Sequence, residues 1–307
     1  MSGIIDFMPR RFGHANLWVS NIERSIQFYE GVLGLELVRR ERLLKMGFHS
    51  NGNSHHDVGM IEISRGVDRY GRDGMVQIPK TRGMTVGLNH LAWEMASERE
   101  LVEAYKRIQP LFDANLWTVD HIVAHSVYVP DPDGNLHEFY ADALDDWRTV
   151  FNLAIEDEVT AAWDPLAKIP SDVHRYPVNP PIRSVPDAPL HPTRISRATL
   201  GTNDLERMVY FFVDIIGLRL KDRDQNMVRF GGSAGGEDLH VVKTPEGAKT
   251  GLQALTFVVP EEYDITAAAT RLSENGIYAA LSACSKRPLL TVTDPDGFRI
   301  EFVNPAN

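Results

Sequence analysis

The stretch 125–142 reads HSVYVPDPDGNLHEFYAD, and the stretch 289–304 reads LLTVTDPDGFRIEFVN. Each is an apolar run, an Asp-Pro-Asp-Gly tetrapeptide and a second run in which a glutamate follows the glycine by four residues. A turn sequence of this kind between two strand-like runs predicts a β-hairpin. Because the hairpin occurs twice, the chain contains an internal repeat, and the repeat indicates how the fold is built.

The repeat extends well beyond the two hairpins. Residues 20–37 (SNIERSIQFYEGVLGLEL) match residues 203–220 (NDLERMVYFFVDIIGLRL) without a gap. Each segment predicts an amphipathic helix that ends near a glycine and is followed by a strand. A short run of strand character precedes each helix, at 12–19 and at 195–202.

Two further strand-like runs, 87–95 and 251–259, both begin with Gly-Leu and lead through a helical segment to a hairpin. The chain therefore contains four βαβββ units, beginning near residues 12, 85, 194 and 249. No unit is large enough to bury a core alone, so the first should pair with the second and the third with the fourth. The predicted fold class is α+β, with two domains of cupped mixed sheets and helices outside.

The domain boundaries follow from this pairing. We expect an N-terminal domain over 1–150 and a C-terminal domain over 194–307. Residues 151–193 should form a partly helical segment and a linker, because 177–192 contain six prolines in sixteen positions.

Composition excludes several classes of protein. The net charge is −10 and no run of lysine and arginine occurs, so neither nucleic acid nor an anionic membrane is the expected partner. No apolar run approaches the length of a transmembrane helix. The single cysteine, Cys284, cannot form an internal disulfide, and a cytoplasmic location is expected.

Strand alternation brings potential metal ligands to one surface. It places His14 and His90 on the face opposite the apolar residues of equivalent first strands, and Glu138 enters from the last strand of the hairpin. One such histidine alone is more often a surface side chain or one satisfied by hydrogen bonds. Three ligand-type residues at equivalent positions of a repeat instead predict a site of two imidazoles and one carboxylate, which suits Fe(II) and leaves coordination positions open.

The second half of the chain provides an internal comparison. Arg197 stands at the position of His14, Ala254 stands at that of His90, and Glu301 alone is retained. Eight of the eleven histidines precede residue 140. We therefore expect the metal site in the N-terminal domain, with the C-terminal domain as a degenerate copy.

The four-unit repeat, the helix ERSIQFYEGVLGLEL and the hairpin YVPDPDGNLHEFYAD resemble the vicinal oxygen chelate (glyoxalase/bleomycin resistance/dioxygenase) superfamily. Within it they resemble the type I extradiol, or catechol 2,3-, dioxygenases, over roughly 12–145 and 194–304. One difference is that two-domain enzymes of this family usually hold their metal in the C-terminal pair of units.

The resemblance also implies catalytic residues. The family has a histidine–aspartate step near the end of the active domain's first unit, here His56-Asp57 in SHHDVGMIEI. Its histidine assists oxygen chemistry, and we carry this role to His56 rather than to His55, which should lie on the opposite strand face. A histidine seven residues before a tyrosine of the hairpin corresponds to His121 and Tyr128, which would hold substrate oxygens and transfer protons.

The resemblance implies an extradiol dioxygenase that inserts O2 into a small aromatic diol and gives a product of the muconic semialdehyde type. The implied metal is Fe(II), with Mn(II) as the alternative because the same ligands suit both. The protein is expected to be a homo-oligomer.

Two other functions fit the same frame. A metal-dependent glyoxalase, isomerase, epimerase or thiol transferase of the superfamily would add a fourth ligand, for which Glu62 is the candidate. Such an enzyme would consume no oxygen. In a binding protein of the bleomycin-resistance kind the three ligand-type residues would be incidental. The C-terminal half shows that the frame tolerates the loss of these residues, so their retention in the N-terminal half counts against this alternative.

Overall fold

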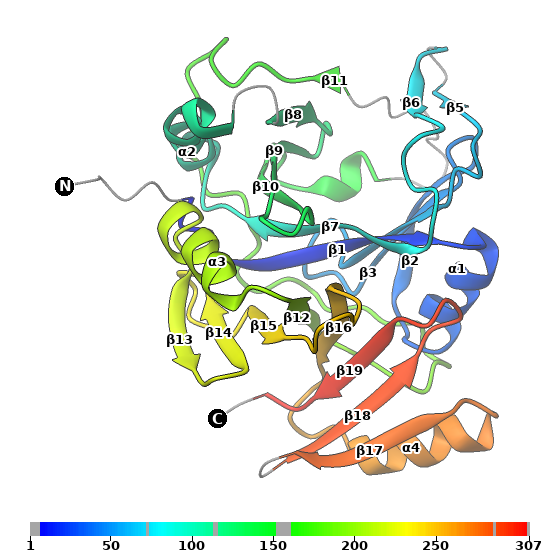
Figure 1. Cartoon of the computed structure of the whole chain (residues 1–307). Helices are drawn as coiled ribbons and strands as arrows, with labels where there is room; N and C mark the ends of the chain where they lie inside the picture. The colour runs from blue at the N-terminus through cyan, green and yellow to red at the C-terminus, as the bar shows by residue number, and fades with distance from the viewer. Residues whose placement is uncertain (1–6, 72–73, 113–115, 152–160, 285–286, 306–307) are drawn as a thin grey trace.

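A computed structural model of the chain describes residues 7–71, 74–112, 116–151, 161–284 and 287–305. Two large sheets dominate the molecule, and Figure 1 shows the first in the upper half and the second in the lower half. The first sheet has nine strands and the second has eight. Among the described residues, no helix is both long enough and apolar enough to cross a membrane.

The first domain contains the nine-stranded sheet, ordered β11-β8-β9-β10-β7-β1-β4-β3-β2. Its elements in chain order are β1 (Arg11–Val19), α1 (Ile22–Gly31), β2 (Glu36–Glu41), β3 (Met46–Ser50), β4 (Val58–Glu62), β7 (Gly87–Glu94), α2 (Glu98–Phe112), β8 (Trp117–Asp120), β9 (Ala124–Pro130), β10 (Leu136–Asp142), the 3-10 helix η2 (Trp147–Thr149) and β11 (Ala161–Ala162). A separate two-stranded sheet comprises β5 (Arg69–Tyr70) and β6 (Val76–Ile78).

The second domain contains the eight-stranded sheet, ordered β13-β14-β15-β12-β16-β19-β18-β17. Its elements are β12 (Arg194–Thr202), α3 (Leu205–Tyr210), η3 (Phe211–Ile215), β13 (Arg219–Arg223), β14 (Met227–Gly231), β15 (Leu239–Lys243), β16 (Gly251–Val258), α4 (Ile265–Glu274), β17 (Ala279–Cys284), β18 (Arg287–Thr293) and β19 (Arg299–Val303).

The two sheets have the same internal pairing. In the first, β1 and β7 pair antiparallel at the centre, and the strands that follow them on either side, β4 and β10, are parallel to their neighbours. In the second, β12 and β16 pair antiparallel, with β15 and β19 parallel on either side. The prediction of an α+β fold with four repeated units paired in two mixed sheets is confirmed.

The turn sequence that opens each hairpin has the same structural role in both copies. Asp131 Oδ1 accepts hydrogen bonds from the backbone nitrogens of Asp133 and Asn135. Asp294 Oδ1 accepts the equivalent pair in the other domain, and the glycines of the two turns have φ of 85° and 92°. The tetrapeptide therefore fixes the register of the hairpin that carries Glu138.

The helices that precede β2 and β13 differ in one respect. Asn21 caps α1 and Asp204 caps α3, each accepting a hydrogen bond from the backbone nitrogen three residues later. The sequence predicts the same helix at both places, but α3 is short and its chain continues as the π-helix η3. Both segments still turn at a glycine in the left-handed region, Gly34 or Gly217.

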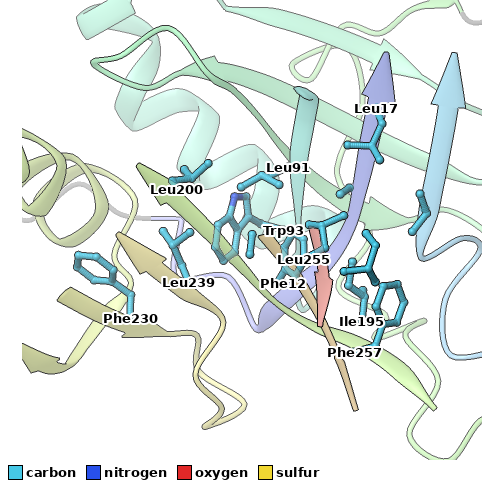
Figure 2. Close-up of a cluster of buried hydrophobic side chains, with 14 of the residues drawn as sticks. Phe12, Leu17, Leu91, Trp93, Ile195, Leu200, Phe230, Leu239, Leu255 and Phe257 are labelled. Carbon is cyan, nitrogen blue, oxygen red and sulfur yellow. The ribbon is translucent and has the colours of Figure 1, made fainter. Parts of the chain in front are cut away.

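One hydrophobic core joins the two domains. Figure 2 shows Phe12 and Trp93 of the first sheet close to Leu239 and Leu255 of the second. These side chains are fully buried, and β1 packs against β12. Because the inner faces of the sheets are used in this contact, the opposite face of the first sheet is left to form a cavity.

The segment between the domains adds a strand to the first sheet. Among its described residues, 151 and 161–193, no helix occurs, and β11 lies at the edge of the first sheet beside β8. That the segment is partly helical stays a prediction. The remainder, 152–160, lies outside the described residues. Ala161 and Ala162 line the cavity described below, so this segment covers part of its wall.

Candidate metal centre and its cavity

The free face of the first sheet surrounds a cavity of about 470 Å³. His90 and Glu138 lie on its wall, together with the aromatic side chains of Trp18, Phe48 and Tyr128. A volume of this size is typical of small-molecule sites and exceeds what a single aromatic ring needs.

The three predicted metal ligands come together beside this cavity. His14 Nε2 lies 3.2 Å from Glu138 Oε2, and His90 Nε2 lies 2.9 Å from the same oxygen. All three side chains are buried, and one donor atom from each falls within a group whose members are 4.8 Å or less apart. The register explains this, because Glu138 pairs with Ala92 on β7, and Ala92 pairs with His14 on β1.

The donor set fits a divalent metal ion. Ligands about 2.1 Å from one ion and at right angles to each other are about 3.0 Å apart, close to the separations found here. His90 Nδ1 lies 2.6 Å from Asn89 Oδ1 and donates to it, and this contact orients the ring so that Nε2 faces the Glu138 carboxylate. A metal ion between the two groups would be coordinated by both, with Asn89 holding the imidazole in place.

The protonation states of His14 and Glu138 are those of metal ligands. Burial lowers the pKa of His14 to about 3, so this imidazole is neutral near pH 7. Burial alone would raise the pKa of Glu138, but His90 and His14 hold it well below its usual range. Ser126 Oγ also donates to Glu138 Oε1 at 2.6 Å and fixes the orientation of the carboxylate.

Two of the predicted catalytic residues lie at one side of the cluster. Tyr128 pairs directly with Glu138 across the hairpin, and its hydroxyl lies 2.9 Å from His121 Nε2. The same His121 nitrogen is 3.7 Å from Glu138 Oε1. Burial lowers the pKa of His121 and raises that of Tyr128 well above 10, so both side chains are neutral near pH 7.

His56 lies at the other side, with its ring centroid 3.8 Å from that of His14. Its Nε2 is 3.1 Å from Asn16 Oδ1, to which it donates when the ring is neutral. Burial lowers the pKa of His56 well below 6.5, and His56 Nδ1 is a buried atom without a hydrogen-bond partner among the described residues. The site therefore has one polar group beside each histidine ligand, His56 beside His14 and Tyr128 beside His90.

His55 is not turned away from the site, and the sequence-based placement of it was wrong. Residues 51–57 lie between β3 and β4 rather than within a strand, so strand alternation does not apply to them. Both His55 and His56 line the cavity, and the ring centroid of His55 is 5.3 Å from that of His14. His14, His55 and His56 form a second group that could hold a metal ion.

Glu62 does not point at the cluster. It accepts hydrogen bonds from Lys45 Nζ at 2.7 Å and from the backbone nitrogen of Ile22 at 3.2 Å, beside α1. Glu138 on β10 pairs with Ala92 on β7. In the other half of the sheet the equivalent residue of β4 is Gly59, which pairs with Asn16 on β1. A Cβ at Gly59 would lie 2.0 Å from Asn16 Oδ1, so the place of a fourth ligand is filled by the amide of Asn16.

The second sheet has an ion pair where the first has the cluster. Arg197 occupies the register position of His14, and its Nη2 lies 3.8 Å from Glu301 Oε2. Thr256 Oγ1 donates to the same carboxylate oxygen at 2.9 Å. The guanidinium therefore provides the positive charge that a metal ion would provide beside Glu138.

Ser126 was missed in the sequence, although it lies two residues before Tyr128 on the same strand, so alternation could have placed it on the face of Glu138. Alternation in 12–19 does place Asn16 on the same face as His14, and the structure adds its contact with His56. His125 pairs with Glu98 at 2.8 Å and stacks on Trp163, away from the cluster.

Residues 11–139 and 194–302 match the family model described as Glyoxalase/Bleomycin resistance protein/Dioxygenase superfamily. The matched residues make up more than half of the chain, and the chain belongs to this superfamily. The expected fold of two vicinal oxygen chelate domains is confirmed.

Individual relatives agree with this assignment. The chain is 25% identical over 286 residues to a catechol-2,3-dioxygenase of Bacillus subtilis, covering 86% of this chain and 88% of the relative. A structure of homoprotocatechuate 2,3-dioxygenase from Brevibacterium fuscum has a TM-score of 0.67 at 16% identity and covers 100% of this chain and 83% of that one. An Mn(II)-bound glyoxalase from Novosphingobium aromaticivorans has a TM-score of 0.64 at 16% identity, covering 96% and 82%. The two structures share the fold, and the fold alone does not separate their activities.

Proposed function

We propose that the protein is an extradiol ring-cleaving dioxygenase, which acts on a small aromatic diol with O2 at an Fe(II) site formed by His14, His90 and Glu138. The observation that supports this proposal is that three potential ligands meet around the Glu138 carboxylate and that, among the described residues, no second carboxylate joins them. Gly59 stands where a fourth carboxylate would enter, and Glu62 is held by Lys45 beside α1. A three-ligand set leaves room for a chelating substrate and a second small molecule.

The metal would supply a point at which diol and dioxygen bind together, which ground-state oxygen needs in order to react with the diol. The other chemistry falls to the protein. Because His121 is neutral, it can accept a proton from a diol oxygen, and the protonated hydroxyl of Tyr128 can donate a hydrogen bond to the same oxygen. Both groups would reach this oxygen, since they lie 2.9 Å apart beside the cluster.

His56 would act on the opposite side of the site. Its bond to Asn16 fixes the ring with Nε2 protonated, which leaves Nδ1 as a proton acceptor. Trp18, Phe48 and Ile61 line the same cavity and would exclude water from a bound ring. With His121 and Tyr128 on one side of the cluster and His56 on the other, protons would be transferred at two separate sides of the bound substrate.

The test is oxygen uptake by protein that is purified without oxygen, loaded with Fe(II) and offered a panel of catechols. We expect uptake together with a yellow ring-opened product. His14→Ala should abolish both, whereas the matched variant His125→Ala should retain them, because His125 pairs with Glu98 outside the cluster. If no catechol draws oxygen although iron binds, the proposal is wrong, and hemithioacetal isomerisation with Mn(II) becomes the assay of choice.

A further inference from the structure

Arg82 is the only lysine or arginine among the side chains that line the cavity in the described part of the chain. Its guanidinium carbon lies 4.8 Å from the centroid of the Trp117 ring, a cation–π contact at the wall. The backbone around it is held by two hydrogen bonds, from Arg82 N to Pro79 O and from Ser64 N to Gly83 O, both 2.9 Å. The side chain is thus half-buried on an ordered turn.

This guanidinium has no carboxylate partner among the residues that the structure describes, whereas several other cationic side chains of the first domain do. Arg39 pairs with Glu41, Lys45 with Glu62 at 2.7 Å, and Arg40 with Glu23 at 2.5 Å. The chain has 42 acidic residues against 32 basic ones, so carboxylates are abundant. An arginine that faces a cavity and lacks a carboxylate can accept one from a ligand.

The wall between Arg82 and the metal cluster is a stack of side chains. The ring of Trp117 lies 4.7 Å from that of Tyr128, its partner in register on β9, and Tyr128 reaches His121 and Glu138 with its hydroxyl. A diol that binds at the cluster beside Tyr128 could therefore extend a side arm past Trp117 to Arg82. The cavity has room for such an arm beyond one aromatic ring.

We infer that Arg82 binds an anionic group, a carboxylate on a side arm of the aromatic diol, and that this contact determines which diols the enzyme prefers. The inference rests on the proposed function and narrows its substrate class. Trp117 would pack against the apolar part of the arm, and the guanidinium would pair with the carboxylate near the mouth of the cavity, where Trp117 is 45% exposed.

The test compares a catechol that carries a carboxymethyl or carboxyethyl arm with the neutral primary amide of the same compound. Binding is measured without oxygen on the Fe(II)-loaded protein by quenching of tryptophan fluorescence, since Trp18 and Trp117 line the cavity. Turnover is then measured by oxygen uptake. The variants are Arg82→Gln and Arg82→Lys, and Arg65→Gln is the matched control, because Arg65 donates to Ser20 O and does not line the cavity.

We expect the wild type to bind the carboxylate about tenfold or more tightly than the amide, which is the effect of one charge-assisted hydrogen-bonded pair. Arg82→Gln should remove this preference, Arg82→Lys should keep part of it, and Arg65→Gln should leave it unchanged. Equal binding of the two compounds by the wild type, or a preference that survives in Arg82→Gln, would overturn the inference. If the preference follows Arg82 but no diol draws oxygen, the proposed function fails and the anion site stands.

Discussion

The buried carboxylate of Asp57 accepts a hydrogen bond from the backbone nitrogen of Ile195, 3.1 Å away in the other domain. The contact is reciprocated, because Asp238 Oδ1 accepts a hydrogen bond at 3.0 Å from the backbone nitrogen of Phe12 in the first domain. Each aspartate precedes the strand that runs parallel to the central strand of its own sheet. The duplicated domains are therefore joined by a duplicated pair of hydrogen bonds, whose donors belong to Phe12 and Ile195, two residues of the core labelled in Figure 2.

Asp57→Asn should destabilise the protein, by about 1–3 kcal/mol, because an amide cannot accept from the backbone nitrogens of both Asn51 and Ile195. Asp238→Asn is the matched variant, since it removes the same type of contact on the side without a metal cluster. Denaturant unfolding of the metal-free proteins measures both. A loss at Asp57 alone would mean that its role concerns the neighbouring His56 rather than the joining of the domains.

The cost of Asp57→Asn should also depend on pH. Burial raises the pKa of Asp57 from 3.8 to about 6, against the backbone hydrogen bonds and Arg11, which lower it. A carboxyl whose pKa is higher in the folded state contributes stability that is complete below its unfolded value and is lost as the pH rises through its folded value. The difference in unfolding free energy between wild type and Asp57→Asn should therefore be largest near pH 4 and shrink as the pH passes about 6. A difference that grows with pH would contradict this sign.

How far the sequence predicts the site depends on whether strand alternation applies. His14, His90 and Glu138 lie on strands whose register follows from the repeat, and the structure brings all three together. His55 lies between strands, where no period fixes the direction of a side chain, and its placement was wrong. The fold was predictable for the same reason, because the repeat shows itself in every unit.

The sequence does not predict which residues meet when the strands pair and the turns pack. Glu62 has the right residue type near the right place, yet its side chain points to α1, and the true counterpart of Glu138 is a glycine. A glycine carries no chemical signal, so only the paired strands reveal that Asn16 fills the space above it. Arg82 similarly reaches the cavity from a turn whose course depends on tertiary contacts.

Ser126→Ala should weaken metal binding about 10- to 100-fold while leaving the fold intact, because Ser126 donates to the Glu138 oxygen that faces away from His14 and His90. Titration of the metal-free protein with Fe(II) or Mn(II), followed by the rise in melting temperature, measures the affinity. Ser196→Ala, on a strand of the other sheet, is the comparison. An unchanged affinity in Ser126→Ala would mean that the histidines alone orient the carboxylate.

Gly59→Ala should displace Asn16, since the new Cβ would stand 2.0 Å from Asn16 Oδ1. The expected cost is about 1–3 kcal/mol of stability, with metal binding retained, as for other overpacked interiors. In an Asn16→Ala background the same substitution should cost little, so the two effects are not additive. Equal costs in both backgrounds, measured by denaturant unfolding, would show that the clash lies elsewhere.

Tyr128→Phe should separate proton chemistry from metal binding. The variant keeps the ring that packs on Trp117 and loses only the hydroxyl that lies 2.9 Å from His121. We expect metal content and melting temperature to stay unchanged and kcat for ring cleavage to fall at least about 100-fold, which is typical for loss of one positioned proton-transfer group.

The pH profile adds a second measure of the same hydroxyl. Because burial and the Glu138 carboxylate raise the pKa of Tyr128 well above 10, the wild type should show no loss of activity from this tyrosine between about pH 7 and pH 9. His121→Asn should lower kcat in the same way as Tyr128→Phe, and the double variant should be little worse than either single one, since the two side chains share one hydrogen bond. Fully additive losses would mean that His121 and Tyr128 act on different protons, and the role of the pair would have to be divided between two substrate oxygens.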